Sequence, residues 1–131
     1  MDELIVGDPE LLSTDVGSVI DADALKMLNG HAERMNREAK LIKAVTLGAG
    51  TENGNFFAPR AYELKSLDQL QGEVLGPVRH VIRFDAAALD NVIDAINATG
   101  SGRTLGITPA SDTTAPRLAS ASDSANTARS R

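Results

Sequence analysis

The sequence predicts an α/β fold, and three observations predict it. Residues 78–84, 86–98 and 104–107 have the patterns of a strand, a helix and a strand in that order, which implies a right-handed crossover and a parallel strand pair. Earlier in the chain, an apolar stripe repeats with helical period. Short extended runs follow that stripe. Together they predict an α/β fold that contains a parallel strand pair.

The first helix is expected to begin after Asp21, because its carboxylate suits an N-cap and Asp23 favours the first turn electrostatically. Five apolar residues then fall on one face at steps of three and four: Leu25, Leu28, Ala32, Met35 and Ala39. Gly30 weakens this helix by about 1 kcal/mol relative to alanine without forbidding it.

Strands and a second helix follow in order. Residues 41–45 suit a short strand, residues 48–54 form a glycine-rich loop, and residues 56–64 resume in extended form. Residues 78–84 give the best strand pattern. In the helix expected at 86–98, the apolar face is made of Leu89, Val92, Ile93 and Ile96, and Gly100 is a natural C-terminal stop.

Composition divides the chain into a structured body, residues 1–107, and a low-complexity tail, residues 108–131. In the tail, 15 of 24 residues are Ala, Ser or Thr, and Leu118 is its only large apolar side chain. Such a segment buries too little apolar surface to offset its ordering entropy. We therefore expect residues 108–131 to be disordered.

The net charge of −5, with acids and bases interspersed, argues against a nucleic-acid or anionic-membrane surface. No apolar run approaches the roughly 18 residues of a membrane span, so we expect a cytoplasmic protein. The chain has no Cys, which excludes disulfides and a cysteine nucleophile within it. His31 and His80 lie far apart without metal-ligand spacing, and no metal site is expected.

The stretch GEVLGPVRHV places Glu73 just before the Gly76–Pro77 pair, at the start of the strand expected at 78–84. Two interpretations remain open: Glu73 is a solvated turn residue, or it faces a ligand. In the strand itself, Arg79 and Arg83 share one face, which suits solvent. His80 alternates with apolar neighbours and suits a packed, hydrogen-bonded histidine, whereas His31 suits the helix surface.

Three blocks carry a family resemblance: VGDPELLSTDVGSVID, NFFAPRAYELKSLDQLQGEVLGPVRHVIRF and LDNVIDAINATGSGRTLGI. Together they resemble the aldehyde dehydrogenase superfamily across residues 3–107. Within it, they are most similar to pyrroline-5-carboxylate dehydrogenases, particularly the dehydrogenase half of the bifunctional proline utilisation A proteins. The resemblance implies part of the catalytic domain, with a parallel sheet and flanking helices, from the region that follows the nucleophile.

The resemblance also implies a role for the turn. In the family, a Glu-x-Phe-Gly-Pro motif presents a Glu that accepts hydrogen bonds from the nicotinamide ribose hydroxyls of NAD. Glu73 stands at that position, and a carboxylate can accept two hydroxyl donors at once. Leu75 stands where the family has Phe, next to the nicotinamide, and keeps the apolar character without the flat ring. Glu73 and Leu75 are thus the cofactor-binding candidates.

The resemblance implies that catalytic groups lie outside this chain. The family uses a Cys thiolate, a general-base Glu and an oxyanion Asn, all upstream of the matching region, as is the cofactor domain. We therefore expect an inactive fragment with no catalytic residue of its own and no tight NAD binding. The alternatives are a non-catalytic module that pairs with a full-length dehydrogenase, as a homo- or hetero-oligomer, or one piece of a split enzyme.

Overall fold

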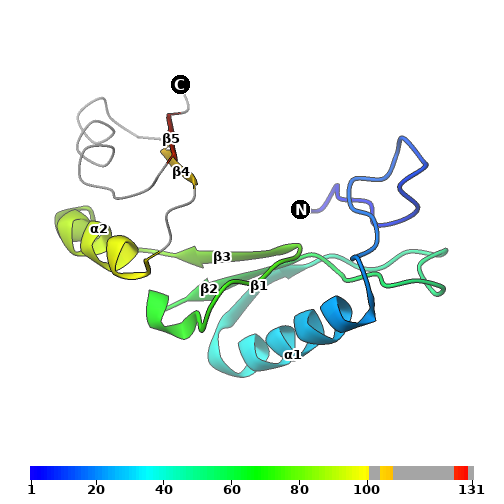
Figure 1. The fold of residues 1–131 in the computed structure, drawn as a ribbon, viewed down its shortest axis with the longest axis horizontal. Helices are drawn as coiled ribbons and strands as arrows, with labels where there is room; N and C mark the ends of the chain where they lie inside the picture. The colour runs from blue at the N-terminus through cyan, green and yellow to red at the C-terminus, as the bar shows by residue number, and fades with distance from the viewer. Residues whose placement is uncertain (101–103, 108–125, 130–131) are drawn as a thin grey trace. The chain divides into compact units, whose positions relative to one another are not determined.

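The structure is a computed structural model that describes residues 1–100, 104–107 and 126–129. It divides into two compact units, residues 1–83 and 84–131. The first unit contains α1 (Ala22–Glu38), β1 (Lys40–Ala44), β2 (Arg60–Leu64), the short 3-10 helix η1 (Leu67–Gln69) and β3 (Val78–Ile82). Figure 1 labels α1 and the three strands. The second contains the 3-10 helix η2 (Ala86–Ala88), α2 (Leu89–Ala98), β4 (Thr104–Ile107) and β5 (Asn126–Arg129).

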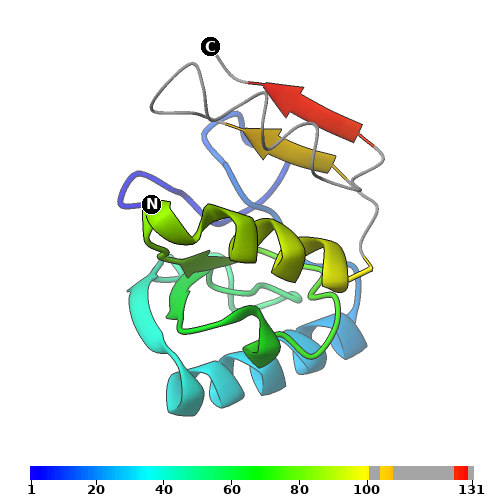
Figure 2. The same ribbon diagram turned by 90° about the vertical axis from the view of Figure 1, so that its left-hand side faces the viewer.

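Helix α1 begins where the sequence predicts. The Asp21 carboxylate accepts a hydrogen bond from the Ala24 backbone N–H at 2.7 Å, which satisfies one of the donors that a helix N-terminus leaves open. The predicted stripe is also confirmed, because Leu28, Ala32 and Met35 are buried. The 17-residue helix lies along one side of the sheet (Figure 2).

The sheet of the first unit has the order β1-β2-β3. Strand β2 is antiparallel to β1 and parallel to β3, so the sheet is mixed. The pairing of β1 with β2 shifts register between Leu41 and Lys43, which marks a β-bulge. The α/β class predicted from the sequence is confirmed, but the first sheet is not wholly parallel.

Two apolar clusters join α1 to the sheet. One contains Leu28, Ala32 and Phe57, and the other contains Met35, Tyr62 and Leu64. Residue Val78 of β3 packs against both clusters. The apolar stripe of α1 therefore packs against Phe57 and against apolar side chains of β2 and β3. Burial of this kind is the main stabilising term for such a helix.

The second unit begins with η2, which continues as α2. Asp85 accepts a hydrogen bond from the Ala87 N–H at 2.9 Å, and Ile93 is buried. Gly100 ends the helix with a φ of 67°, and its N–H donates to the Asn97 carbonyl at 3.1 Å. The helix and its glycine stop thus agree with the sequence prediction.

The parallel pairs in the structure are β2 with β3 and β4 with β5. The sequence also predicts a parallel pair between the strands before and after α2. These strands belong to different units, so that pair stays a prediction.

Part of the predicted tail is also a strand. Residues Asn126–Arg129 form β5, which pairs in parallel with β4, and the disorder expected from composition for residues 108–131 stays a prediction. Residues 108–125 and 130–131 lie outside the described residues. The domain boundary after residue 107 stays a prediction. Among the helices that the structure describes, none is long and apolar enough to cross a membrane.

Candidate cofactor-contacting turn

The turn that leads into β3 alternates exposed and packed side chains. Glu73 and Leu75 are exposed, and Leu75 has 64% of its surface accessible. Between them, Val74 is half-buried and packs against the cluster of Leu28, Ala32 and Phe57. One inward side chain thus anchors the turn while the carboxylate and the apolar side chain on either side of it point outward.

Gly76 allows the turn to approach α1 closely. A Cβ atom built on Gly76 would lie 2.6 Å from both Cδ atoms of Leu28, which is shorter than any stable carbon–carbon contact. The glycine also has a φ of 158°, which side chains of L-residues rarely accept. The close contact with Leu28 of α1 therefore requires a glycine at position 76.

Pro77 is held by hydrogen bonds on both sides. The Val78 N–H donates to the Gly76 carbonyl at 2.8 Å, and the Arg60 N–H donates to the Pro77 carbonyl at 3.0 Å. The first bond closes a tight turn around the proline, whose own φ is restricted. The second ties the turn to the start of β2, so that the backbone following Glu73 is fixed before β3 begins.

This arrangement can present one carboxylate and one apolar side chain to a ligand. A carboxylate accepts hydrogen bonds from a pair of adjacent hydroxyls, and an exposed leucine can cover the face of a ring. The structure leaves both interpretations of Glu73 open, because solvent can also occupy its exposed side. Assignment of Glu73 and Leu75 to a cofactor stays a prediction.

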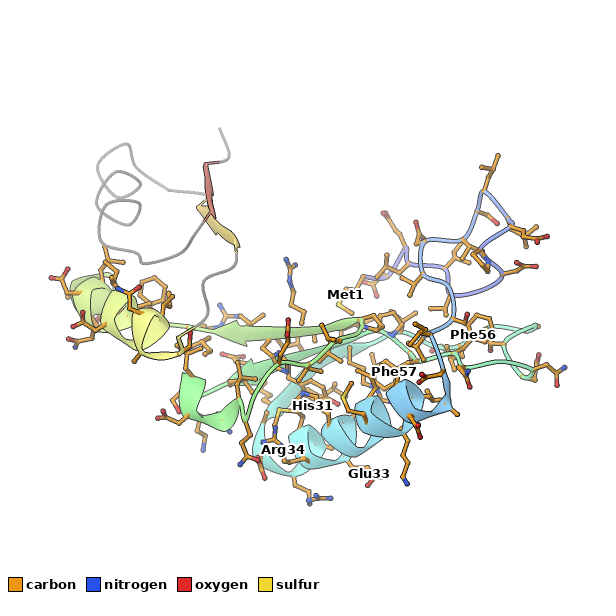
Figure 3. All side chains as sticks on the ribbon, viewed as in Figure 1. Met1, His31, Glu33, Arg34, Phe56 and Phe57 are labelled. Atoms are coloured by element: carbon orange, nitrogen blue, oxygen red, sulfur yellow. The ribbon has the colours of Figure 1, made fainter. Side chains whose placement is uncertain are left out.

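Sequence reasoning missed a pair of histidines. Nε2 of His31 lies 2.9 Å from Nε2 of His80, and the two rings meet edge to face with centroids 5.1 Å apart. His31 is only 8% exposed and lies between α1 and the sheet in Figure 3, so the expectation that it is a surface residue is wrong. His80 is half-buried and hydrogen-bonded, as expected.

A signal for this pair was present in the sequence. His31 lies three residues after Leu28 and four before Met35, which places it on the apolar stripe of α1. His80 lies between Val78 and Ile82 on the face of β3 that packs against the clusters. The partner across 49 residues could not be read from either local pattern.

Both histidines favour their neutral forms. Burial lowers the pKa of His31, and the nearby Arg34 guanidinium lowers it further. Burial also lowers the pKa of His80, with additional contributions from His31 and Arg34. In neutral form, one imidazole donates its Nε2–H and the other accepts with Nε2, and either residue can take either role.

Arg79 of β3 and Arg83, which directly follows β3, are exposed, as predicted. Arg83 donates through Nε to Glu63 Oε1 at 2.8 Å. Glu63 also lies 3.8 Å from the Lys40 ammonium. These partly exposed ion pairs contribute little to stability. They place the Glu63 carboxylate between the positive charges of Arg83 and Lys40.

A groove of about 620 Å³ lies at the C-terminal end of α1 and is lined by residues 37–40, 63–65 and 83. It does not include Glu73 or Leu75. Within the part of the chain that the structure describes, no three His, Asp or Glu side chains gather as a metal site.

Comparisons with known proteins place these features in context. The model of the aldehyde dehydrogenase family matches residues 1–128. The chain is 37% identical over 112 residues to the bifunctional protein PutA of Klebsiella aerogenes, covering 82% of this chain and 8% of that protein. It is 41% identical over 99 residues to PutA of Rhizobium meliloti, covering 76% of this chain and 8% of that protein.

A solved structure is similar as well. The crystal structure of the D779W mutant of proline utilization A from Bradyrhizobium japonicum matches with a TM-score of 0.90 and 37% identity. The match covers 97% of this chain and 13% of that chain. The chain thus spans a small part of the length of the relatives it matches.

Proposed function

We propose, from the premise that this chain belongs to the aldehyde dehydrogenase family, that it forms part of the catalytic domain of an NAD-dependent L-glutamate γ-semialdehyde dehydrogenase of proline catabolism. The similarity to PutA proteins supports this choice within the family. The observation that carries the proposal is the turn before β3, where Glu73 is exposed and Gly76 packs against α1.

In this proposal, Glu73 accepts hydrogen bonds from the two hydroxyls of the nicotinamide ribose. Such a carboxylate fixes the ribose and therefore the ring attached to it, which orients the ring toward the substrate. Leu75 covers the nicotinamide with apolar surface. When bound, NAD accepts the hydride that leaves the substrate. Residues of this chain thus orient the cofactor and take no proton or electron themselves.

The covalent step belongs to groups that this chain does not contain. Aldehyde oxidation in the family proceeds through a thiolate adduct, and this sequence has no Cys. Hydrogen bonds that one carboxylate accepts contribute about 1.5–3 kcal/mol each, which is too little to hold a dinucleotide against the entropy lost on binding. We propose that the 131-residue chain by itself neither oxidises the aldehyde nor retains NAD.

The test replaces the matching segment of Bradyrhizobium japonicum proline utilization A with residues 3–107 of this chain and measures aldehyde-dependent NADH formation. In an active chimera, Glu73→Ala should raise KM for NAD about 10-fold to 100-fold, the equivalent of one charge-assisted hydrogen bond. The matched control, Glu33→Ala, removes an exposed carboxylate from α1 and should leave KM unchanged. An unchanged KM for NAD in the Glu73 variant would refute the ribose contact.

A non-catalytic interaction module is the alternative function. Strand β1 lies at one end of the first sheet, and Leu41 and Ile42 in it are each 45% exposed. An exposed strand edge with apolar side chains can pair with a strand of another chain. Co-purification of a full-length dehydrogenase with the tagged chain, lost on Ile42→Lys, would favour the module. A chain that associates with no dehydrogenase would favour the catalytic fragment.

A further inference from the structure

We propose that the hydrogen bond between His31 and His80 is a proton-sensitive latch that positions the Glu73 turn against α1. The latch is defined as these two imidazoles, and its link to cofactor binding rests on the proposed function of Glu73. In this view, the histidines are positioning residues: they act on the turn and touch neither cofactor nor substrate.

Helix α1 contacts the turn at one position and strand β3, which follows the turn, at a neighbouring one. Leu28 packs where Gly76 leaves room for it, and His31, one helical turn later, bonds to His80. Val74 and Val78 pack against the same cluster that contains Leu28. The latch is the polar contact among these apolar ones, and its hydrogen bond depends on the protonation state of the two imidazoles.

Proton counting shows how the latch responds. The neutral pair has one Nε2–H donor and one Nε2 acceptor, so the bond observed at 2.9 Å is satisfied. A first added proton leaves an acceptor but places a positive charge in a buried site. A second proton leaves two donors and no acceptor, and the like charges repel.

The charged group that acts on the pair is also positive. Arg34, on α1, lowers the pKa of both histidines. On the sheet, Tyr62 of β2 stands opposite His80 in register, and its hydroxyl bonds to Asn36 at 2.9 Å. Arg79, next to His80 on β3, belongs to the opposite, exposed face of the strand. The surroundings therefore disfavour protonation of the latch.

The sign of the pH dependence follows from linkage. Both pKa values are lowered in the folded state, so the unfolded chain binds these protons first, near its ordinary histidine pKa of about 6.5. The stability supplied by the latch is fully present above about pH 6.5 and is lost as the pH falls below it. The chain has two histidines, both in the latch, so side-chain protonation between about pH 5 and 7 reports on it.

The first experiment follows the full 131-residue chain by NMR from pH 8 to pH 4.5 without cofactor. At pH 7.5, we expect one imidazole protonated at Nε2 and the other at Nδ1, and both should titrate below the ordinary histidine pKa. The backbone amides of residues 72–76 and of Val78 should shift with the same midpoint. Titration of both rings at about pH 6.5 with unshifted turn amides would overturn the latch.

Variants separate a latch from a merely structural contact. His31→Gln keeps a side chain that can donate or accept but leaves His80 as the one titrating ring, so two like charges can no longer meet and the pH-dependent shift of the turn amides should become smaller. His80→Gln supplies a second version should the first fail to fold. Arg34→Gln should move the titration midpoint of the pair to higher pH, because it removes a neighbouring positive charge.

The matched control is Lys26→Gln, which removes the same charge from an exposed position of α1 and should leave the midpoint within experimental error. Equal shifts from both charge removals, or turn amides that shift with pH as strongly in His31→Gln as in the unchanged chain, would contradict the proposal. Because no cofactor is present, these outcomes are independent of the ribose contact, which the Glu73→Ala chimera tests separately.

Discussion

Replacing Gly76 by alanine should destabilise the first unit through a clash with one identified side chain. The new Cβ would lie 2.6 Å from both Cδ atoms of Leu28, at a φ of 158°. Overpacking of this kind costs about 1–3 kcal/mol, because Leu28 is fully buried and has little room to move. The cost should fall when Leu28 is made smaller.

A double-mutant cycle measures that relief. Leu28→Ala alone should cost about 2.7–5 kcal/mol, the range for a buried leucine. In the double variant Leu28→Ala with Gly76→Ala, the clash is absent. Its loss of unfolding free energy should therefore be about 1–2 kcal/mol smaller than the sum of the losses of the two single variants. The φ-related part of the alanine cost should remain, since it does not depend on Leu28.

Urea denaturation provides the assay. The chain has one Tyr and no Trp, so intrinsic fluorescence reports on Tyr62, which is fully buried beside α1. Should Leu28→Ala be unfolded without urea, Leu28→Val completes the cycle at lower cost. The matched control is Gly30→Ala, on the exposed side of α1 with no atom within 4 Å of its built Cβ, which should stabilise the helix by up to about 1 kcal/mol. Strictly additive losses for Leu28 and Gly76 would refute the close approach of the turn to the helix.

The remaining predictions concern single contacts. Tyr62→Phe removes the hydroxyl that donates to Asn36 Oδ1 at 2.9 Å and should cost about 1 kcal/mol, measured by urea denaturation followed by circular dichroism; a neutral result would show that the bond adds nothing beyond solvation. Asp21→Ala removes the N-cap bond to Ala24 and should also cost about 1 kcal/mol, whereas Asp21→Asn should retain most of it; equal losses in both variants would contradict the capping role. The purified chain should form no NADH from glutamate semialdehyde and show no NAD binding by calorimetry at sub-millimolar concentration, and activity that Glu73→Ala abolishes would overturn the fragment interpretation.

Local chemistry was sufficient to predict the helices. Asp21 caps α1 through a contact three residues away, and the apolar residues of the stripe repeat within the same helix. Gly100 ends α2 through a bond to Asn97. Each of these features depends on residues close in sequence, so the pattern contains both partners of the interaction.

Strand positions could be predicted more closely than strand partners. The sequence placed strands at 41–45 and 78–84, and the structure has them at Lys40–Ala44 and Val78–Ile82. The parallel pairing of β3 with β2 was not predicted, because alternation identifies a strand and its faces but carries no information about its neighbour. The antiparallel pairing of β1 with β2 was likewise absent from the local pattern.

For the candidate site, the sequence by itself determined the exposed Glu73 at a Gly-Pro turn and the family resemblance that gives it a role to test. The tertiary structure decided why Gly76 must be a glycine and why His31 is buried, since both depend on α1 meeting a segment about 50 residues away. A helix face can be predicted from its own period, but the side chain that it meets is chosen by packing of the whole unit. That packing brings Leu28 to Gly76 and His31 to His80, because close-packed interiors accept only side chains that fit both surfaces.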